Sequence, residues 1–202
     1  MEKYARVKFR VELCRKEVPS DERIKELSYW CREFHSHGLT PLQEGKSAGN
    51  LSFRLREGAK NFIITASGLG PKGSLTAKCF VEVSGCSIDK NVVYASGLRE
   101  PSSESILHCR IYELREDVNA IFHGHDPAIL KNANNLGLVE TKEWHPYGSI
   151  ELVRGVENVL GENNFIVMKK HGFISLGRGK DAMKMAGMLA LEKHKAALQK
   201  KD

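Results

Sequence analysis

The stretch Pro101–Asp126, PSSESILHCRIYELREDVNAIFHGHD, contains one predicted helix followed by one predicted strand. Residues 102–115 have helical apolar spacing, and VNAIFH is a short apolar run typical of a buried strand. Two serines and Glu104 stand at the start of the helix, and His123 and His125 stand at the end of the strand. A carboxylate at one end and a His-x-His pair at the other indicate a site where the two elements meet.

The rest of the chain mixes helices and strands without a strict βαβ rhythm. Further helices are predicted at residues 20–38, 126–136, 149–160 and 180–200. Further strands are predicted at GNLSFRL, NFIITASG, KCFVEV, NVVYAS, NFIVMKK and FISLG. The early strands read as hairpin-connected, so we expect an α/β fold with a mostly antiparallel sheet covered by helices. The length of 202 residues, without repeat or linker, predicts a single domain over residues 1–202.

The composition narrows the possible functions. Hydrophobic residues make up 41% and charged residues 28%, as in soluble globular proteins. No apolar run approaches ~18 residues, so we expect no membrane span. The start, MEKYARVKFRVELCRKEVP, lacks the apolar stretch of a secretory signal, which predicts a cytoplasmic protein. The net charge of +6 is spread out, which disfavours nucleic-acid binding and suits a phosphorylated small molecule.

The cysteines show no pattern typical of disulfide bonds or of a zinc site. There are five, an odd number, and none forms a C-x-x-C pair. This pattern argues against a disulfide framework and against a cysteine-based zinc site. Cys31 and Cys109 fall in helical patterns and are predicted to be small core residues.

His123 and His125 are the first candidates for metal ligands. On a strand, residues i and i+2 point to the same face, which suits two imidazoles on one ion. Gly124 between them allows the backbone to lie close to another layer. Two buried core histidines are the alternative interpretation. His171, between an apolar strand and Gly172, is the best third ligand, with a simple turn histidine as its alternative. The other candidates are expected to be solvated or surface residues: His35, His37, His145 and His194.

Two segments are candidates for binding an anion. Ser102 or Ser103 can cap the helix that starts near Glu104, and free N–H groups at a helix start favour anions. An ordinary N-terminal turn would have the same sequence. The Gly-rich turn after a strand in TASGLGPKGS, residues 65–74, is a weaker candidate, and Asn50 after Ala48-Gly49 is weaker still.

Taken together and in order, these pieces resemble the class II aldolase/adducin family. The resemblance spans residues 49–177 and rests on AGNLSFR, TASG, PSSE followed by His108 and Tyr112, HGH, YGS and KKHG. It implies a three-layer α/β/α sandwich around a mainly antiparallel, mixed sheet, assembled as a homotetramer with sites between subunits.

The resemblance also implies a chemistry. It puts Zn²⁺, or another divalent metal, on His123, His125 and His171, with Glu104 as the catalytic acid/base and a fourth ligand when no substrate is bound. It puts the phosphate of a small sugar or ketose phosphate among Asn50, Ser67, Gly68, Ser102 and Ser103. The implied enzyme is a zinc-dependent lyase that cleaves or forms a C–C bond through a zinc-stabilised enediolate.

The chain departs from the family pattern at two places. Ala66 stands where the family commonly has proline in TPSG. The segment 126–146 is short where the aldolases carry a tyrosine that protonates the aldehyde oxygen, which leaves Tyr147 as the candidate donor. Rival functions are a sugar-phosphate dehydratase, an epimerase and an adducin-like scaffold without chemistry. Glutamate at position 104 disfavours a 4-epimerase, because those enzymes resemble each other in having aspartate there. The three histidines disfavour the scaffold.

Overall fold

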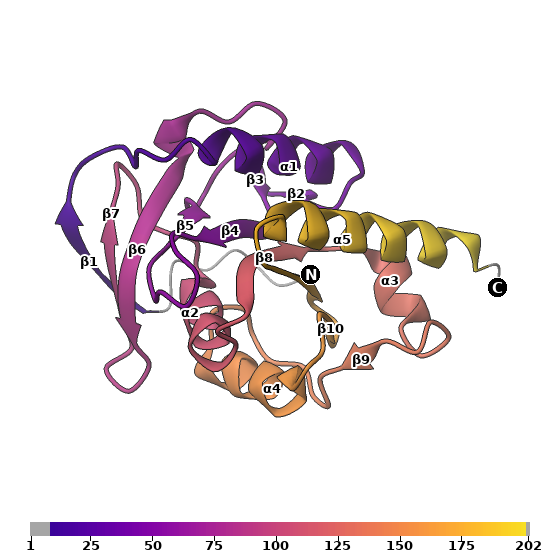
Figure 1. The fold of residues 1–202 in the computed structure, drawn as a ribbon. Coiled ribbons are helices and arrows are strands. Elements are labelled where there is room, and N and C mark those ends of the chain that lie inside the picture. The colour runs from indigo at the N-terminus through magenta and orange to yellow at the C-terminus, as the bar shows by residue number, and fades with distance from the viewer. Residues whose placement is uncertain (1–8, 201–202) are drawn as a thin grey trace.

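A nine-stranded sheet forms the middle layer of the structure, and helices cover both of its faces (Figure 1). The computed structural model describes residues 9–200. The helices are α1 (Ile24–Ser36), α2 (Ser105–Leu114), α3 (Pro127–Asn132), α4 (Ile150–Leu160) and α5 (Ala182–Gln199), with a 3₁₀ turn at Ala77–Cys79. The strands are β1 (Arg10–Arg15), β2 (Leu42–Gln43), β3 (Lys46–Ser47), β4 (Asn50–Arg54), β5 (Phe62–Thr65), β6 (Phe80–Ser87), β7 (Val92–Ser96), β8 (Val118–Gly124), β9 (Val139–Glu140), β10 (Phe165–Met168) and β11 (Gly172–Arg178).

The sheet is mixed but mainly antiparallel. Its strand order is β1-β7-β6-β5-β4-β8-β11-β10-β9, and β2 pairs with β3 in a separate small ladder. Only the two edge pairs of the large sheet, β1 with β7 and β9 with β10, are parallel. The predicted α/β fold, a three-layer α/β/α sandwich around a mainly antiparallel sheet, is confirmed.

The predicted helices and the longer strands are present, with ends that differ by a few residues. The start of α4 shows why its sequence is readable: the Ser149 hydroxyl accepts a hydrogen bond from the Leu152 amide, and Gly161 ends the helix. Strand β1 was not predicted, because five of its six side chains are exposed and no buried face marks it. The expectation of no secretory signal concerned the first residues of the sequence. Of these, residues 1–8 lie outside the described part of the structure.

Strand β8 shows how alternation divides the core into two halves. Phe122 packs into the cluster formed with α1 and α5, whereas Ile121 packs into the cluster formed with α2 and α4. Since side chains two apart share a face, His123 points to the side of Ile121 and α2. The strand therefore presents His123 toward the helix that starts next to Glu104.

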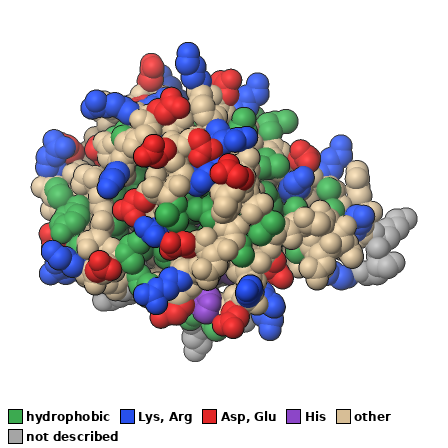
Figure 2. Space-filling model, turned by 60° about the horizontal axis from the view of Figure 1, so that its bottom comes forward, with side chains coloured by type: hydrophobic (Ala, Val, Ile, Leu, Met, Phe, Trp, Pro, Cys, Tyr) green, Lys and Arg blue, Asp and Glu red, His purple; other side chains and the backbone are tan. Residues whose placement is uncertain are grey.

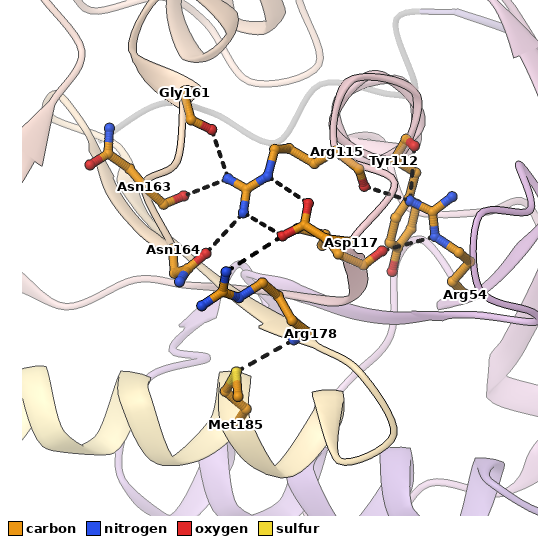
Figure 3. Close-up of polar contacts among 10 residues, drawn as sticks. Arg54, Tyr112, Arg115, Asp117, Gly161, Asn163, Asn164, Arg178 and Met185 are labelled. Carbon is orange, nitrogen blue, oxygen red and sulfur yellow. Dashed lines mark hydrogen bonds and ion pairs between the residues drawn. The ribbon is translucent and has the colours of Figure 1, made fainter.

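A buried arginine joins the far end of α2 to the start of β8 (Figure 3). The guanidinium of Arg54 is only 1% exposed and donates to the carbonyl oxygens of Tyr112, Arg115 and Val118 at 2.8–2.9 Å. A fourth bond reaches the Ala59 carbonyl. These carbonyls end the helix and begin the strand, so Arg54 fixes the direction in which both elements run toward the site.

Arg54→Met is expected to lower the free energy of unfolding by about 3 kcal/mol. The methionine keeps apolar bulk, but several buried carbonyl groups lose their donor, and each such loss costs roughly 1–3 kcal/mol. Urea unfolding followed by circular dichroism measures the change. The matched control is Arg56→Met in the following turn, where the arginine is exposed and the change should stay within about 0.5 kcal/mol. Equal stability of the two variants would contradict this role.

One expectation about the cysteines is wrong. Cys109 is buried as predicted, but the structure joins it to Cys86 in a disulfide, with 6.4 Å between their Cα atoms. Cys86 lies on β6 and Cys109 on α2, which packs on the same face of the sheet. No spacing pattern marks this pair, because the two residues meet only through tertiary packing. Cys31 is a buried, unpaired core residue, as predicted.

The surface carries both signs of charge. On the face drawn in Figure 2, Lys and Arg side chains are interspersed with Asp and Glu. None of the helices within residues 9–200 combines the length and the apolar character that crossing a bilayer requires.

Candidate metal centre and active-site cavity

The site is built at the end of β8, between its two neighbours in the sheet. In the ladder, His123 lies opposite Asn50 on β4 and opposite Ile174 on β11. His171 directly precedes β11, so the antiparallel pairing of β8 and β11 returns it to the end of the His-x-His pair. Residues far apart in the sequence therefore meet through the register of three adjacent strands.

The three histidines converge on one point. The Nε2 atom of His123 lies 3.1 Å from Nε2 of His125 and 3.3 Å from Nε2 of His171. Of the His, Cys, Asp and Glu side chains in residues 9–200, these three form the group with ligand atoms close enough to share one metal ion. The structure thus brings together all three histidines that the sequence singled out as metal ligands.

Two of the histidines have features that suit a metal site. Nδ1 of His123 lies 2.8 Å from the Phe173 carbonyl oxygen, so Nδ1 carries a proton and Nε2 is the ring nitrogen that faces the other two histidines. Burial, together with the charges of His123 and His171, holds the pKa of His125 well below its usual range. Neutral imidazoles are the form that binds a divalent ion, so this donor set fits one.

Gly124 makes the close approach of these strands possible. A Cβ placed there would lie 2.6 Å from Cζ of Phe173 and 3.2 Å from the Leu39 carbonyl oxygen. Both neighbours are buried and have no room to retreat. The prediction that a glycine here lets the backbone lie against another layer agrees with these contacts.

Glu104 faces the histidines from the start of α2. Its Oε2 atom lies 3.0 Å from Nε2 of His123, and its Oε1 atom lies 3.2 Å from Nε2 of His171. Asn50 donates to Oε2 through Nδ2 at 2.8 Å. Burial raises the pKa of the Glu104 carboxyl, but His123 and His171 outweigh it and bring the pKa well below its usual range. The side chain is 4% exposed and is held as a carboxylate.

The two serine-bearing segments lie side by side at the mouth of the site. Ala66 and Pro101 form an antiparallel bridge, and the Ser67 amide donates to the Glu100 carbonyl at 2.9 Å. The hydroxyl oxygen of Ser102 accepts a hydrogen bond from the Glu104 amide at 3.3 Å, which is a turn contact at the entrance to α2. This pairing, which no short motif could predict, brings residues 65–68 and 101–104 to one wall.

A cavity of about 260 Å³ opens in front of these groups. Every residue predicted to bind substrate lines it, together with Glu104, His125 and His171. The members singled out from the sequence for substrate binding are Asn50, Ser67, Gly68, Ser102 and Ser103. Tyr147, the candidate proton donor, also stands on the wall.

Sequence reasoning missed several wall residues, above all Lys46 and Lys170. Lys170 adopts a left-handed backbone (φ 56°), which is unusual for a residue with a side chain, and it directly precedes His171. In the sequence, the position of Lys170 next to the candidate ligand His171 was the feature that could have marked it as a cavity residue.

The other histidines lie outside this cavity. His37 is exposed as predicted, but His194 is half-buried and its Nδ1 lies 2.6 Å from a carboxylate oxygen of Asp126. His35 and His145 are also half-buried. His35, His145 and His194 are thus less exposed than predicted, because His35 lies against Gly73, helix α5 packs against α3, and the loop that carries His145 packs against α4.

The family model described as "Class II Aldolase and Adducin N-terminal domain" matches residues 25–194. The chain belongs to the class II aldolase and adducin family. The fold of the family is evident in solved structures as well. An L-fuculose 1-phosphate aldolase superposes with a TM-score of 0.68 at 21% identity, covering 90% of this chain and 87% of that chain. The L-fuculose-1-phosphate aldolase of Thermus thermophilus gives a TM-score of 0.65 at 21% identity, covering 87% and 91%.

Relatives within the class II aldolase and adducin family carry the names of two kinds of enzyme. A methylthioribulose-1-phosphate dehydratase of Gluconacetobacter diazotrophicus is 45% identical over 41% of this chain and 36% of its own length. A 5-methylthioribulose-1-phosphate/5-deoxyribulose-1-phosphate aldolase of Escherichia coli is 29% identical over 77% of this chain and 75% of its own. The L-fuculose phosphate aldolase of Methanococcus maripaludis is 30% identical over 65% and 74%. The match to the dehydratase thus spans little more than a third of that relative.

Proposed function

We propose that this protein is a zinc-dependent lyase that cleaves or forms a C–C bond of a small sugar phosphate. The observation that carries the proposal is the convergence of three imidazole Nε2 atoms and the Glu104 carboxylate at one cavity. The aldolase relatives support it, since two of them align with 65% and 77% of this chain. We also propose a cytoplasmic homotetramer built from one domain per chain, as the family resemblance implies.

The substrate is proposed to enter with its phosphate against the serine-bearing wall. Hydroxyls of Ser67, Ser102 and Ser103 and the amide of Asn50 offer donors to phosphate oxygens, and Gly68 allows close approach of the backbone. The ketose end then lies near Glu104 and the histidines. A positive wall with Lys46 and Lys170 favours entry of an anionic substrate.

The residues in this site would divide the chemistry between them. His123, His125 and His171 would hold Zn²⁺, or another divalent ion, and that ion supplies Lewis acidity toward the carbonyl oxygen of the substrate. Glu104 takes a proton from the carbon next to the carbonyl and returns it in the reverse direction. Asn50 holds the carboxylate on the side of His123. Glu104 can also complete the ligand set when no substrate is bound.

Dehydration of the same class of sugar phosphate is the second candidate. It is favoured by the local identity of 45% to the methylthioribulose-1-phosphate dehydratase. The short segment 126–146, which contains no tyrosine, points the same way. Both reactions need a base at the carbon beside the carbonyl, so Glu104 keeps its role in either. An adducin-like scaffold would need no metal, and metal analysis of the purified protein separates it from both enzymes.

Proton exchange into dihydroxyacetone phosphate tests the aldolase proposal without knowledge of the aldehyde. The zinc-loaded protein is incubated with dihydroxyacetone phosphate in deuterated water, and loss of a C3 proton signal is followed by NMR. Exchange at a rate far above that of the apo protein is expected. If the protein carries its metal and shows no exchange, an aldolase for dihydroxyacetone phosphate is excluded, and the dehydratase becomes the leading candidate.

Tyr147→Phe is expected to spare proton exchange and to slow C–C cleavage by about 10²-fold or more. The tyrosine lines the cavity and is our proposed donor to the aldehyde oxygen, a step that exchange does not include. Cleavage is assayed with fuculose 1-phosphate, and Tyr94→Phe, on a strand away from the cavity, serves as the control. Equal loss of exchange and cleavage would mean that Tyr147 supports the cavity instead of donating the proton.

A further inference from the structure

Lys72 is a buried cation directly behind the site. The side chain is 2% exposed, and it does not line the cavity. Among the described residues, no carboxylate lies within ion-pair distance of its ammonium group. It donates hydrogen bonds instead to two backbone carbonyls. One is the carbonyl of Ala48, at 2.9 Å, and the other is the carbonyl of the neighbouring Gly49. A lysine this deeply buried is uncommon, so these bonds need a reason.

The two carbonyls belong to the turn that leads into β4. Gly49 has a left-handed backbone (φ 72°), and a Cβ there would lie 2.6 Å from the His123 carbonyl oxygen. The turn therefore rests on the backbone of a proposed metal ligand. The ammonium of Lys72 donates hydrogen bonds to both carbonyls of this turn at once, and these two bonds hold the turn in place.

Asn50 follows this turn and makes the contact that orients Glu104. Its Nδ2 donates to Oε2 of Glu104, while its Oδ1 has no partner among the described residues. The side chain is thus guided by one bond and by the position of its own backbone. A small shift of the turn would move the amide away from the carboxylate.

Lys72 keeps its charge despite its burial. Burial lowers the pKa of the ammonium to about 8, against smaller opposing effects of Cys31 and then Glu104. The group is therefore still mostly protonated at neutral pH.

We propose that Lys72 is a positioning residue for Glu104: its ammonium fixes the Ala48–Gly49 turn and, through Asn50, the orientation of the carboxylate. The inference rests on the proposed role of Glu104 as acid/base. Lys72 touches no substrate, so its loss should change turnover more than binding.

The test is a double-mutant cycle of Lys72→Met and Asn50→Ala in the zinc-loaded protein. Each single variant is expected to lower the exchange rate at saturating dihydroxyacetone phosphate by roughly 10- to 100-fold, the range for residues that orient a metal-site ligand. The KM of the Lys72→Met variant should stay within about twofold of wild type. The double variant should lose no more than the worse single variant, because both changes break one chain of contacts.

Two controls keep the test decisive. Lys78→Met, at an exposed lysine on the next turn, should exchange like wild type. If Lys72→Met does not fold, Lys72→Gln keeps a donor that can reach one carbonyl, and a smaller loss with the same non-additivity is expected. Wild-type exchange in Lys72→Met, or losses of the two single variants that simply multiply in the double variant, would overturn the proposal.

Failure of the proposed function would look different. In that case the wild-type protein itself shows no exchange, and the crystal structure of Lys72→Met replaces the kinetic readout. The proposal predicts that the Asn50 Nδ2 to Glu104 Oε2 distance, 2.8 Å in the wild-type protein, lengthens beyond hydrogen-bond reach. An unchanged distance would overturn it.

Discussion

Glu104→Gln is expected to slow proton exchange into dihydroxyacetone phosphate by about 10²–10⁴-fold, the usual contribution of a general acid or base. Glutamine keeps the size of the side chain and can still accept the hydrogen bond from Asn50. It cannot take up a proton, because the basic carboxylate oxygen is replaced by an amide. The structure places the wild-type carboxylate at the cavity, where it faces His123 and His171.

The control for this variant lies on the same helix. Glu113→Gln removes an exposed carboxylate near the end of α2 and should leave exchange unchanged. Zinc content must be measured for both variants, because Glu104 is also close enough to the histidines to serve as a ligand. Retained zinc with lost exchange assigns the proton transfer to Glu104. Wild-type exchange in Glu104→Gln would remove Glu104 from the mechanism.

His171→Ala is expected to weaken zinc binding by roughly 100- to 1,000-fold and to abolish activity at micromolar zinc. Structural zinc sites with four ligands bind with about 10–16 kcal/mol, so one ligand accounts for roughly 2.5–4 kcal/mol, and each 1.4 kcal/mol is about tenfold in affinity. His171 lies 3.3 Å from His123 between Nε2 atoms and faces Glu104 as well. Competition with a zinc-binding dye measures the affinity.

His37→Ala is the matched control, since His37 is exposed and lies outside the cavity. Its zinc affinity should equal that of the wild-type protein. Circular dichroism of the metal-free proteins separates loss of a ligand from loss of fold. A folded His171→Ala variant that binds zinc as tightly as wild type would show that the three histidines do not share an ion.

The sequence was most informative where one local rule decides the structure. The apolar run VNAIFH predicted strand β8, and period-two geometry predicted the common direction of His123 and His125. Helical spacing of apolar residues likewise predicted α4 over residues 149–160. The same reasoning missed β1, although Arg10–Leu13 alternates charged and apolar side chains, because the alternating segment is short and most of its side chains are exposed. Spacing on one strand face identified His123 and His125 as candidate ligands, and a position between an apolar strand and Gly172 identified His171.

Convergence across the sheet was beyond local reasoning. The pairing of Ala66 with Pro101 joins the two anion-binding segments, and the register of β4 on β8 places Asn50 next to His123. Neither contact can be predicted from the sequence on either side of the residues involved. Lys72 lies in the Gly-rich segment 65–74, but no sequence pattern predicted its burial. The burial follows from the packing of a loop and not from any periodicity.

The central place of β8 in the sheet has a consequence for how the chain would acquire the proposed zinc ion. Before folding, only His123 and His125 are neighbours, whereas His171 is 48 residues away from His123 and joins them when β8 and β11 pair. Unfolded polypeptide can therefore offer a weak two-nitrogen chelate at most, and closing so long a loop has an entropic cost. Zinc should accordingly bind after the sheet has assembled and then slow its unfolding, so that metal starvation in a cell would shorten the lifetime of the protein as well as silence it.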